Sequence, residues 1–312
     1  SSHDCAKGIG IVASNGGNIR DYEGVDKSQK PMCPMVAINT TAGTASEITR
    51  FCIITDTSRH VKMAIVDWRV TPQIAINDPK LMVGMPPSLT AATGMDALTH
   101  AIEAYVSTLH CNYTDAVALH AIKMIHQYLK KSYDGCMEAR AAMHDAQCLA
   151  GMAFSNALLG IVHSMAHKTG AAYSTSHIIH GCANAMYLPK VIKFNAKDEA
   201  AAKRYAEIAE HIGLAGNSTE ELVDSLIAEL RSMNDKLNIP QSIQNYGAGG
   251  VKAETSIIDE TEFLDKLPEV AANAITDACT GSNPRQPSQE EMEKLQQFTE
   301  QVNRNIKEYT NS

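Results

Sequence analysis

The sequence predicts an α/β layer followed by an all-α part, because its pattern of apolar residues changes near residue 87. Residues 1–87 combine a first helix with short β-branched runs separated by Gly, Asn, Pro and Asp, which favours strands in an α/β layer. Residues 88–312 show long stretches of helical period instead. Aromatic residues make up only 5% of the chain, as expected where small Ala side chains let helices pack closely. We therefore expect two domains, at 1–87 and 88–312.

The first domain begins with a helix and continues with four strands. Ser1 to Asp4 resemble a helix N-cap box, with an acidic residue three positions after the serine. The strands are expected in a parallel sheet at 35–38, 51–55, 63–66 and 73–76. Pro86 and Pro87 end the extended segment, and Ser88 is the expected N-cap of the first long helix.

The second domain is expected to be helical almost throughout. Its helices are predicted at 88–107, 113–131, 136–158, 160–171, 182–194, 197–212, 219–237 and 260–276. Gly-rich composition predicts loops at 213–217 and 245–250. An amphipathic stretch at 288–312 predicts a docked terminal helix.

Charge and cysteine usage limit the classes of partner. The 312 residues carry 27 Lys and Arg against 35 Asp and Glu, a net charge of −8 that argues against nucleic-acid or anionic-membrane binding. The eight cysteines stand singly, without C-x-x-C spacing, and are expected to be reduced, mostly buried thiols of a cytoplasmic protein. No apolar run approaches the roughly 20 residues that a membrane helix needs, and no leader pattern precedes the body.

Asp96 and His100 are the first candidate metal ligands. They lie four residues apart in a helical stretch, so both side chains leave the same face and can bind one cation. An Asp–His⁺ pair on a helix surface explains this spacing equally well when the segment is taken alone.

Four of the 12 histidines fall between residues 160 and 184, which favours the metal interpretation. His163 and His167 are again four apart, while His177 and His180 follow a polar turn. Carboxylate oxygen mixed with imidazole nitrogen suits Zn²⁺ or Fe²⁺ better than Ca²⁺ or Mg²⁺. An open position on such an ion can hold and polarise an alcohol or carbonyl oxygen.

The sequence resembles the iron-containing (group III) alcohol dehydrogenases, including the alcohol dehydrogenase part of aldehyde-alcohol dehydrogenases and the butanol and propanediol dehydrogenases. The matching motifs are Asn-Thr-Thr-Ala-Gly-Thr-Ala-Ser-Glu-Ile-Thr at 39–49, the segment from Met-Pro-Pro to His-Ala-Ile-Glu at 85–103, the segment 163–167, and His-Gly-Cys-Ala-Asn-Ala at 180–185. The resemblance implies a dehydroquinate synthase-like fold, with a partial Rossmann-like dinucleotide-binding layer before a helical metal-binding domain. It also implies metal-dependent, NAD(P)-linked hydride transfer between a small alcohol or aldehyde and nicotinamide.

The resemblance assigns the metal ligands to Asp96, His100, His163 and either His180 or His177. The family's spacing of fourteen residues after His163 selects His177, whereas the motif context at a helix start selects His180. We favour His180, because a helix start holds a ligand more rigidly than a loop of variable length. Fe²⁺ is the expected metal, with Zn²⁺ as the alternative.

The resemblance also assigns the cofactor side of the site. It places His167 near the nicotinamide, where we predict a role in proton relay. It assigns the dinucleotide, NAD(H) or NADP(H), to Ser1, Asp4, Thr40, Thr41, Thr44, Thr49, Ile53, Lys62 and Leu89. We expect Ala, Met, Phe154 and Leu158 to line a pocket for small apolar alcohols.

Ser1 resembles the last residue of the family's Gly-Gly-Gly-Ser phosphate loop, so we expect the first half of the dinucleotide domain to lie outside the printed sequence. The printed chain is then expected to keep its metal domain and to bind the dinucleotide weakly or not at all. A homodimer or larger homo-oligomer is expected. Two alternatives remain: a dehydroquinate-synthase or glycerol-dehydrogenase-like enzyme of the same fold, and a non-catalytic metal-binding helical module.

Overall fold

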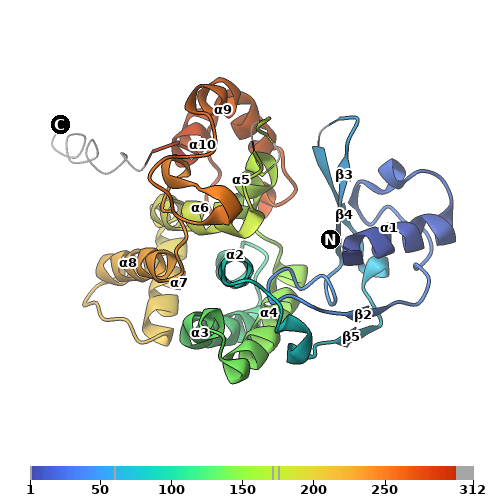
Figure 1. Ribbon diagram of the computed structural model, residues 1–312, viewed down its shortest axis with the longest axis horizontal. Coiled ribbons are helices and arrows are strands. Elements are labelled where there is room, and N and C mark those ends of the chain that lie inside the picture. The colour runs from blue at the N-terminus through green and yellow to red at the C-terminus, as the bar shows by residue number, and fades with distance from the viewer. Residues whose placement is uncertain (1, 60, 171, 175, 300–312) are drawn as a thin grey trace.

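The computed structural model describes residues 2–59, 61–170, 172–174 and 176–299. One side of the molecule holds the α/β elements and the other side holds the long helices (Figure 1). The α/β elements are α1 (Ser2–Asn15), η1 (Ile19–Tyr22), β1 (Gly24–Val25), β2 (Val36–Ile38), β3 (Phe51–Asp56), β4 (Val61–Val66), η2 (Trp68–Val70), β5 (Ile74–Ile76) and η3 (Pro79–Met82). The first helix and all four predicted strands are confirmed, and β1 is an additional short strand.

The strands form two small sheets, one of mixed direction and one parallel. A three-stranded sheet has the order β1-β4-β3, in which β1 runs parallel to β4 and β3 runs antiparallel to it. A separate two-stranded sheet pairs β2 with β5 in parallel. The expectation of a parallel sheet is therefore wrong for β3 and β4. The connection between them, residues 57–60, is too short for the crossover that parallel neighbours need.

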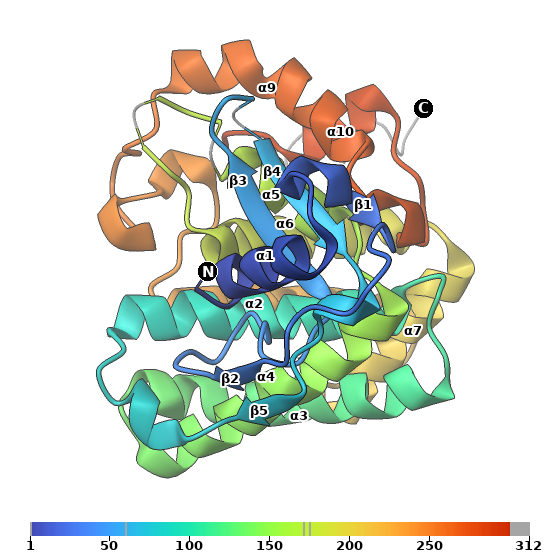
Figure 2. The same cartoon turned by 90° about the vertical axis from the view of Figure 1, so that its right-hand side faces the viewer.

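Helix α1 lies across the three-stranded sheet and covers one of its faces (Figure 2). The residues between them form a small apolar cluster of Ile11, Tyr22, Met32, Cys52, Ile65 and Val70. The buried Lys7 donates from Nζ to the carbonyls of Thr49 and Phe51, at 2.8 Å each. These contacts fix α1 against the chain that enters β3.

The helical part contains α2 (Pro87–Val106), α3 (Asn112–Tyr133), α4 (Met137–Ala157), α5 (Ile161–Thr169), α6 (His180–Asn195), α7 (Glu199–His211), α8 (Thr219–Lys236), α9 (Glu260–Ile275) and α10 (Gln289–Leu295). The eight long helices are confirmed. Ser88 is not the N-cap of α2, because the helix begins at Pro87 and Pro86 occupies the cap position without a side-chain bond. The predicted terminal helix is short, and residues 300–312 lie outside the described residues.

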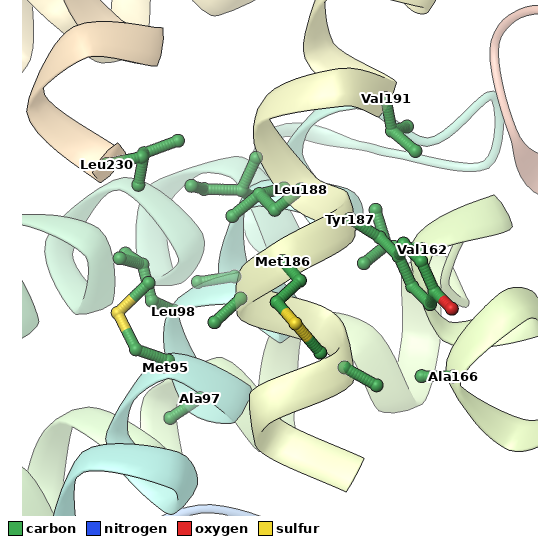
Figure 3. Packing of buried hydrophobic residues seen from close by; sticks show 14 of the residues in the cluster. Met95, Ala97, Leu98, Val162, Ala166, Met186, Tyr187, Leu188, Val191 and Leu230 are labelled. Carbon is green, nitrogen blue, oxygen red and sulfur yellow. The ribbon is translucent and has the colours of Figure 1, made fainter. Parts of the chain in front are cut away.

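A large core joins these helices around α2, which is buried along most of its length. Figure 3 shows side chains from α2, α5, α6 and α8 pointing toward one another, among them Met95, Leu98, Val162, Met186, Leu188 and Leu230. Small residues let the helices come close: a Cβ at Gly181 would collide with the Ala92 carbonyl. The first turn of α6 is thus held directly against α2.

The cysteines are less buried than expected. All eight are free, but Cys5, Cys33, Cys111 and Cys136 are exposed. Only Cys52, Cys182 and Cys279 are buried, so the expectation of mostly buried thiols is wrong.

Among the described residues, no single helix is long and apolar enough to cross a membrane. Helices α4 and α5 meet that criterion only as a pair, and they are bent by 103° at their junction.

Candidate active site

Four predicted metal ligands meet where α2, α5 and α6 pack together. The shared atom is Oδ1 of Asp96, which is buried in α2. Nε2 of His180 lies 3.5 Å from it, Nε2 of His163 lies 3.6 Å from it, and Nε2 of His100 lies 4.0 Å from it. Donor atoms that bind one tetrahedral ion at about 2.1 Å are about 3.4 Å apart. The donor atoms of Asp96, His163 and His180 all lie within 4.8 Å of one another, so these three have the spacing and chemistry to hold a divalent transition metal, with His100 as the more distant fourth candidate.

The competing candidate for the last ligand, His177, lies apart from this group. Its side chain is exposed, and its backbone carbonyl accepts from the Tyr246 hydroxyl at 3.4 Å. His180, in contrast, is the first residue of α6, whose close packing on α2 brings its ring to Asp96.

The charges of the four groups depend on one another. Burial alone would raise the pKa of Asp96, but the three imidazoles hold that pKa far below its usual range. Burial lowers the pKa of His100 to about 3 and lowers that of His180 well below its usual value. Burial also opposes the charge of His163, but the carboxylates of Glu103 and Asp96 raise its pKa to about 9. The site thus combines an ionised Asp96 with two neutral imidazoles, the forms that bind metals.

Two buried side chains that the sequence analysis did not assign contact these ligands. Glu103 lies one turn beyond His100 in α2, and its Oε2 is 2.6 Å from Nδ1 of His163. Asn184 lies one turn beyond His180 in α6, and its Nδ2 is 2.7 Å from Oδ1 of Asp96. The sequence held a signal for both, because each follows a predicted ligand by three or four residues on a helix.

His167 lies beside the ligands, in the last turn of α5. Its ring stacks on that of His180, with centroids 5.2 Å apart. Its Nδ1 lies 3.3 Å from Oδ2 of Asp277, and Lys168 Nζ lies 2.9 Å from the same oxygen. Burial alone would raise the pKa of Asp277, but His167 and Lys168 lower it. An ionised Asp277 therefore accepts the Nδ1 proton of His167.

The four metal-ligand candidates and His167 line a cavity of about 310 Å³ between the helices and the β3–β4 sheet. The cavity wall also includes Asp4, Thr44, Ser46, Thr49, Phe51, Ile53, Thr55, Lys62, Phe154 and Leu159. A larger, more open hollow of about 500 Å³, lined by 254–260 with Gln244 and Phe298, contains none of the predicted site residues.

The predicted dinucleotide residues divide into two groups. Asp4, Thr44, Thr49, Ile53 and Lys62 line the cavity together with the metal-ligand candidates. Thr40, Thr41 and Leu89 do not line it, and Ser1 lies outside the described residues. Lys62 is half-buried, and this burial lowers the pKa of its ammonium group.

The predicted pocket lining is partly wrong. Phe154 lines the cavity, but Leu159 does so in place of Leu158, and no Ala or Met is among the lining residues. Leu158 ends α4 with a φ of 62°, in the left-handed region, and this turn directs the next residue to the cavity. Leucine seldom adopts such a φ, so the sequence did not indicate the turn.

Comparison with known proteins gives the family of this fold and site. The model described as iron-containing alcohol dehydrogenase matches residues 1–79, and the model described as Fe-containing alcohol dehydrogenase family, C-terminal, matches residues 90–298. The chain belongs to the iron-containing alcohol dehydrogenase family. The resemblance recognised from the sequence motifs is thereby confirmed, and with it the dehydroquinate synthase-like fold.

Individual members of the family are similar to this chain over most of its length. The chain is 56% identical over 260 residues to an NADPH-dependent butanol dehydrogenase of Clostridium saccharobutylicum, covering 83% of this chain and 63% of that one. It is 47% identical to an NAD-dependent methanol dehydrogenase of Bacillus methanolicus, covering 91% and 71%. A crystal structure of 1,3-propanediol oxidoreductase superposes with a TM-score of 0.85 at 43% identity, covering 95% and 73%. The chain therefore spans less than two thirds of the length of the butanol dehydrogenase.

Proposed function

We propose that this protein is a metal-dependent, NAD(P)-linked alcohol dehydrogenase or aldehyde reductase, which transfers hydride between a small alcohol or aldehyde and nicotinamide. One observation carries the proposal: three imidazole nitrogens surround a single Asp96 oxygen in a cavity that Thr44, Thr49 and Lys62 also line. The cavity thus combines a metal-binding donor set with residues expected to bind a dinucleotide. The dehydrogenase names of the relatives favour this activity over a lyase or a non-catalytic metal module.

In this proposal Asp96, His100, His163 and His180 hold the metal, with Fe²⁺ expected and Zn²⁺ as the alternative. A bound divalent ion supplies Lewis acidity toward the alcohol or carbonyl oxygen. Glu103 contributes by accepting the Nδ1 proton of His163, so that Nε2 is the nitrogen that would lose its proton to bind a metal.

His167 is the residue proposed to take up or give back the proton of the substrate hydroxyl. Its Nδ1 side is occupied by Asp277, so the Nε2 side of a neutral ring remains available to the cavity. Asp277 acts only through His167 and is therefore a positioning residue.

The dinucleotide is proposed to bind along the cavity wall formed by Asp4, Thr44, Thr49, Ile53 and Lys62. Lys62 offers a positive charge to a phosphate or ribose. Dinucleotide parts that extend beyond the cavity are proposed to contact Thr40, Thr41, Leu89 and Ser1. One relative is named as NADPH-dependent and another as NAD-dependent, so both cofactors are assay candidates.

The proposed substrates are small aliphatic alcohols and aldehydes. Phe51, Ile53, Phe154 and Leu159 give the cavity an apolar wall. Phe154 stacks on His100 with ring centroids 4.2 Å apart, so this wall reaches the proposed metal ligands. The relatives named for butanol and methanol act on alcohols of this kind.

We also propose a division of the chain after residue 87, a homodimer or larger homo-oligomer, and a cytoplasmic location. The family matches at 1–79 and 90–298 support the division. The exposed apolar side chains of β2 and β5, Val36, Ile38, Ile74 and Ile76, support burial in an assembly. The free thiols are typical of a reducing compartment.

The test is consumption of NADH or NADPH by the metal-loaded protein with propanal and butanal, under anaerobic conditions. We expect oxidation of the cofactor that a chelator or Asp96→Ala abolishes and that Asp145→Ala, at an exposed carboxylate, leaves unchanged. Turnover that survives complete metal removal would contradict the proposal. Full metal loading and dinucleotide binding without turnover on any aldehyde would favour the non-catalytic module, whereas metal loading without dinucleotide binding would reflect the missing part of the dinucleotide domain.

A further inference from the structure

We propose that Asn184 is a positioning residue of the metal centre, which holds the Asp96 carboxylate against the imidazole nitrogens. This inference rests on the proposed metal site and adds a role that the ligand set alone does not contain. The buried amide of Asn184 would not bind the metal itself but would hold the Asp96 carboxylate, which is proposed to bind it.

The position of Asn184 brings one amide nitrogen to three proposed donor atoms. Its Nδ2 lies 2.7 Å from Oδ1 of Asp96, 3.1 Å from Nε2 of His163 and 3.4 Å from Nε2 of His180. The side chain is completely buried. Asn184 and His180 are one turn apart on α6, so both face α2.

The chemistry of the amide fits a positioning role. An amide nitrogen donates two hydrogen bonds, and an ionised carboxylate can only accept. The bond to Asp96 is therefore charge-assisted, which makes it short and directional. It fixes the one oxygen that all three imidazoles approach.

Two further observations indicate that the sequence keeps this amide for its N–H groups. Oδ1 of Asn184 is buried and has no hydrogen-bond partner. Leaving such an oxygen unpaired costs about 1–3 kcal/mol, a penalty that an apolar side chain of similar size would avoid. In addition, a Cβ at Gly181 would collide with the Ala92 carbonyl, so the first turn of α6 packs directly against α2. The backbone thus holds Asn184 in place.

The experiment measures the dissociation constant for Zn²⁺ and Fe²⁺ by competition with a chelator, together with the thermal unfolding midpoint of the metal-free protein. The variants are Asn184→Leu, which keeps the volume and removes the donors, and Asn184→Ala. Asn195→Ala is the matched control, because Asn195 is a buried asparagine three turns further along α6 whose amide bonds Tyr205 and Asn283.

We expect both Asn184 variants to bind metal about 10- to 100-fold more weakly, the range found when partners of metal ligands are removed. The metal-free Asn184→Leu protein should unfold below the wild-type temperature, because the buried Asp96 carboxylate loses a hydrogen bond, and Asn195→Ala should also unfold earlier but with unchanged metal affinity. Metal affinity of Asn184→Leu equal to or tighter than that of the wild type would overturn the inference alone. Absence of metal binding by the wild-type protein would overturn the proposed function and this inference with it.

Discussion

Oε2 of Glu103 lies 2.6 Å from Nδ1 of His163, although the two residues are 60 positions apart in the chain. The other oxygen of Glu103 accepts from the backbone N–H of Val162 at 2.8 Å. The carboxylate is therefore held by the first turn of α5 and in turn sets the orientation of the His163 ring. Metal-binding histidines are commonly oriented by a carboxylate in this way.

Glu103→Gln should weaken metal binding by about 10-fold or more. The glutamine amide can satisfy either His163 or Val162 with its oxygen, but its NH₂ group then faces the other N–H donor. The measurement is the metal content per chain after dialysis against graded chelator concentrations. Glu207→Gln is the control, since Glu207 accepts from the Tyr105 hydroxyl and is not among the described partners of His100, His163 or His180. Equal metal retention by the Glu103 and Glu207 variants would contradict the assignment.

Replacing His180 and His177 in turn distinguishes the two candidates for the last ligand. His180→Ala removes a nitrogen 3.5 Å from Asp96 and should release the ion. His177→Ala changes an exposed ring and should retain it. The bound metal is measured after anaerobic loading and gel filtration. Loss of the ion from the His177 variant only would show that the spacing rule, and not the helix start, identifies the ligand.

Phe154→Ala should enlarge the cavity next to His100 and shift the substrate preference toward longer aldehydes. The ring is buried, so its removal should also cost about 3–5 kcal/mol of unfolding free energy. The readout is the ratio of kcat/KM for hexanal to that for propanal. Phe263→Ala, at a buried ring in α9, is expected to cost similar stability without changing this ratio. A ratio unchanged by Phe154→Ala would remove this residue from the substrate wall.

Asp277→Asn should lower kcat about 10-fold or more while KM and metal content change little, because a neutral amide, which can turn its NH₂ group toward Nδ1, replaces the carboxylate that orients the His167 ring. Lys168→Gln is the control, since it removes the second partner of Asp277 and leaves the His167 contact intact. Steady-state kinetics with metal analysis of both variants provide the measurement. A loss of activity in Lys168→Gln as large as in Asp277→Asn would indicate that activity depends on the ion pair between Lys168 and Asp277 and not on the contact between Asp277 and His167.

Lys7 should make stability depend on pH in the alkaline range. Burial lowers its pKa from 10.5 to about 8 in the folded chain. Between these values the unfolded chain binds more protons than the folded chain, so this group makes folding more favourable as the pH rises from 8 to 10.5. The change amounts to about 3 kcal/mol at most.

The Lys7 dependence is measured by urea unfolding at several pH values, compared with Lys7→Met. The difference in unfolding free energy between wild type and variant should shift in favour of the wild type as the pH rises. Lys30→Met, at an exposed lysine, should follow the wild-type curve. Parallel curves for the wild type and Lys7→Met would contradict the explanation by burial.

The sequence predicts correctly those features that depend on the residues of a single segment. Asp96 with His100 and His163 with His167 are spaced one helical turn apart, and the structure has helices at both places. The strands at β2 to β5 were likewise predicted from local runs of β-branched residues. The motifs then gave the family, because several of them occur in the right order along most of the chain.

Contacts between segments that are far apart in the chain could not be predicted from the sequence. Asn184 reaches Asp96 across 88 positions, and Asp277 reaches His167 across 110. Periodicity shows which residues share one face of a helix, but it does not show which other helix packs against that face. Leu158 was mistaken for a wall residue because its left-handed turn runs against the usual preference of leucine.

The central claim is that Asp96, His100, His163 and His180 together bind one divalent ion. The most direct test is anaerobic loading with Fe²⁺ or Zn²⁺, followed by metal analysis of the wild type, Asp96→Ala and the control Asp145→Ala. The account predicts about one ion per chain in the wild type and the control, and almost none in Asp96→Ala, because Asp96 provides the carboxylate that all three histidines approach. Retention of the full metal content by Asp96→Ala would contradict it.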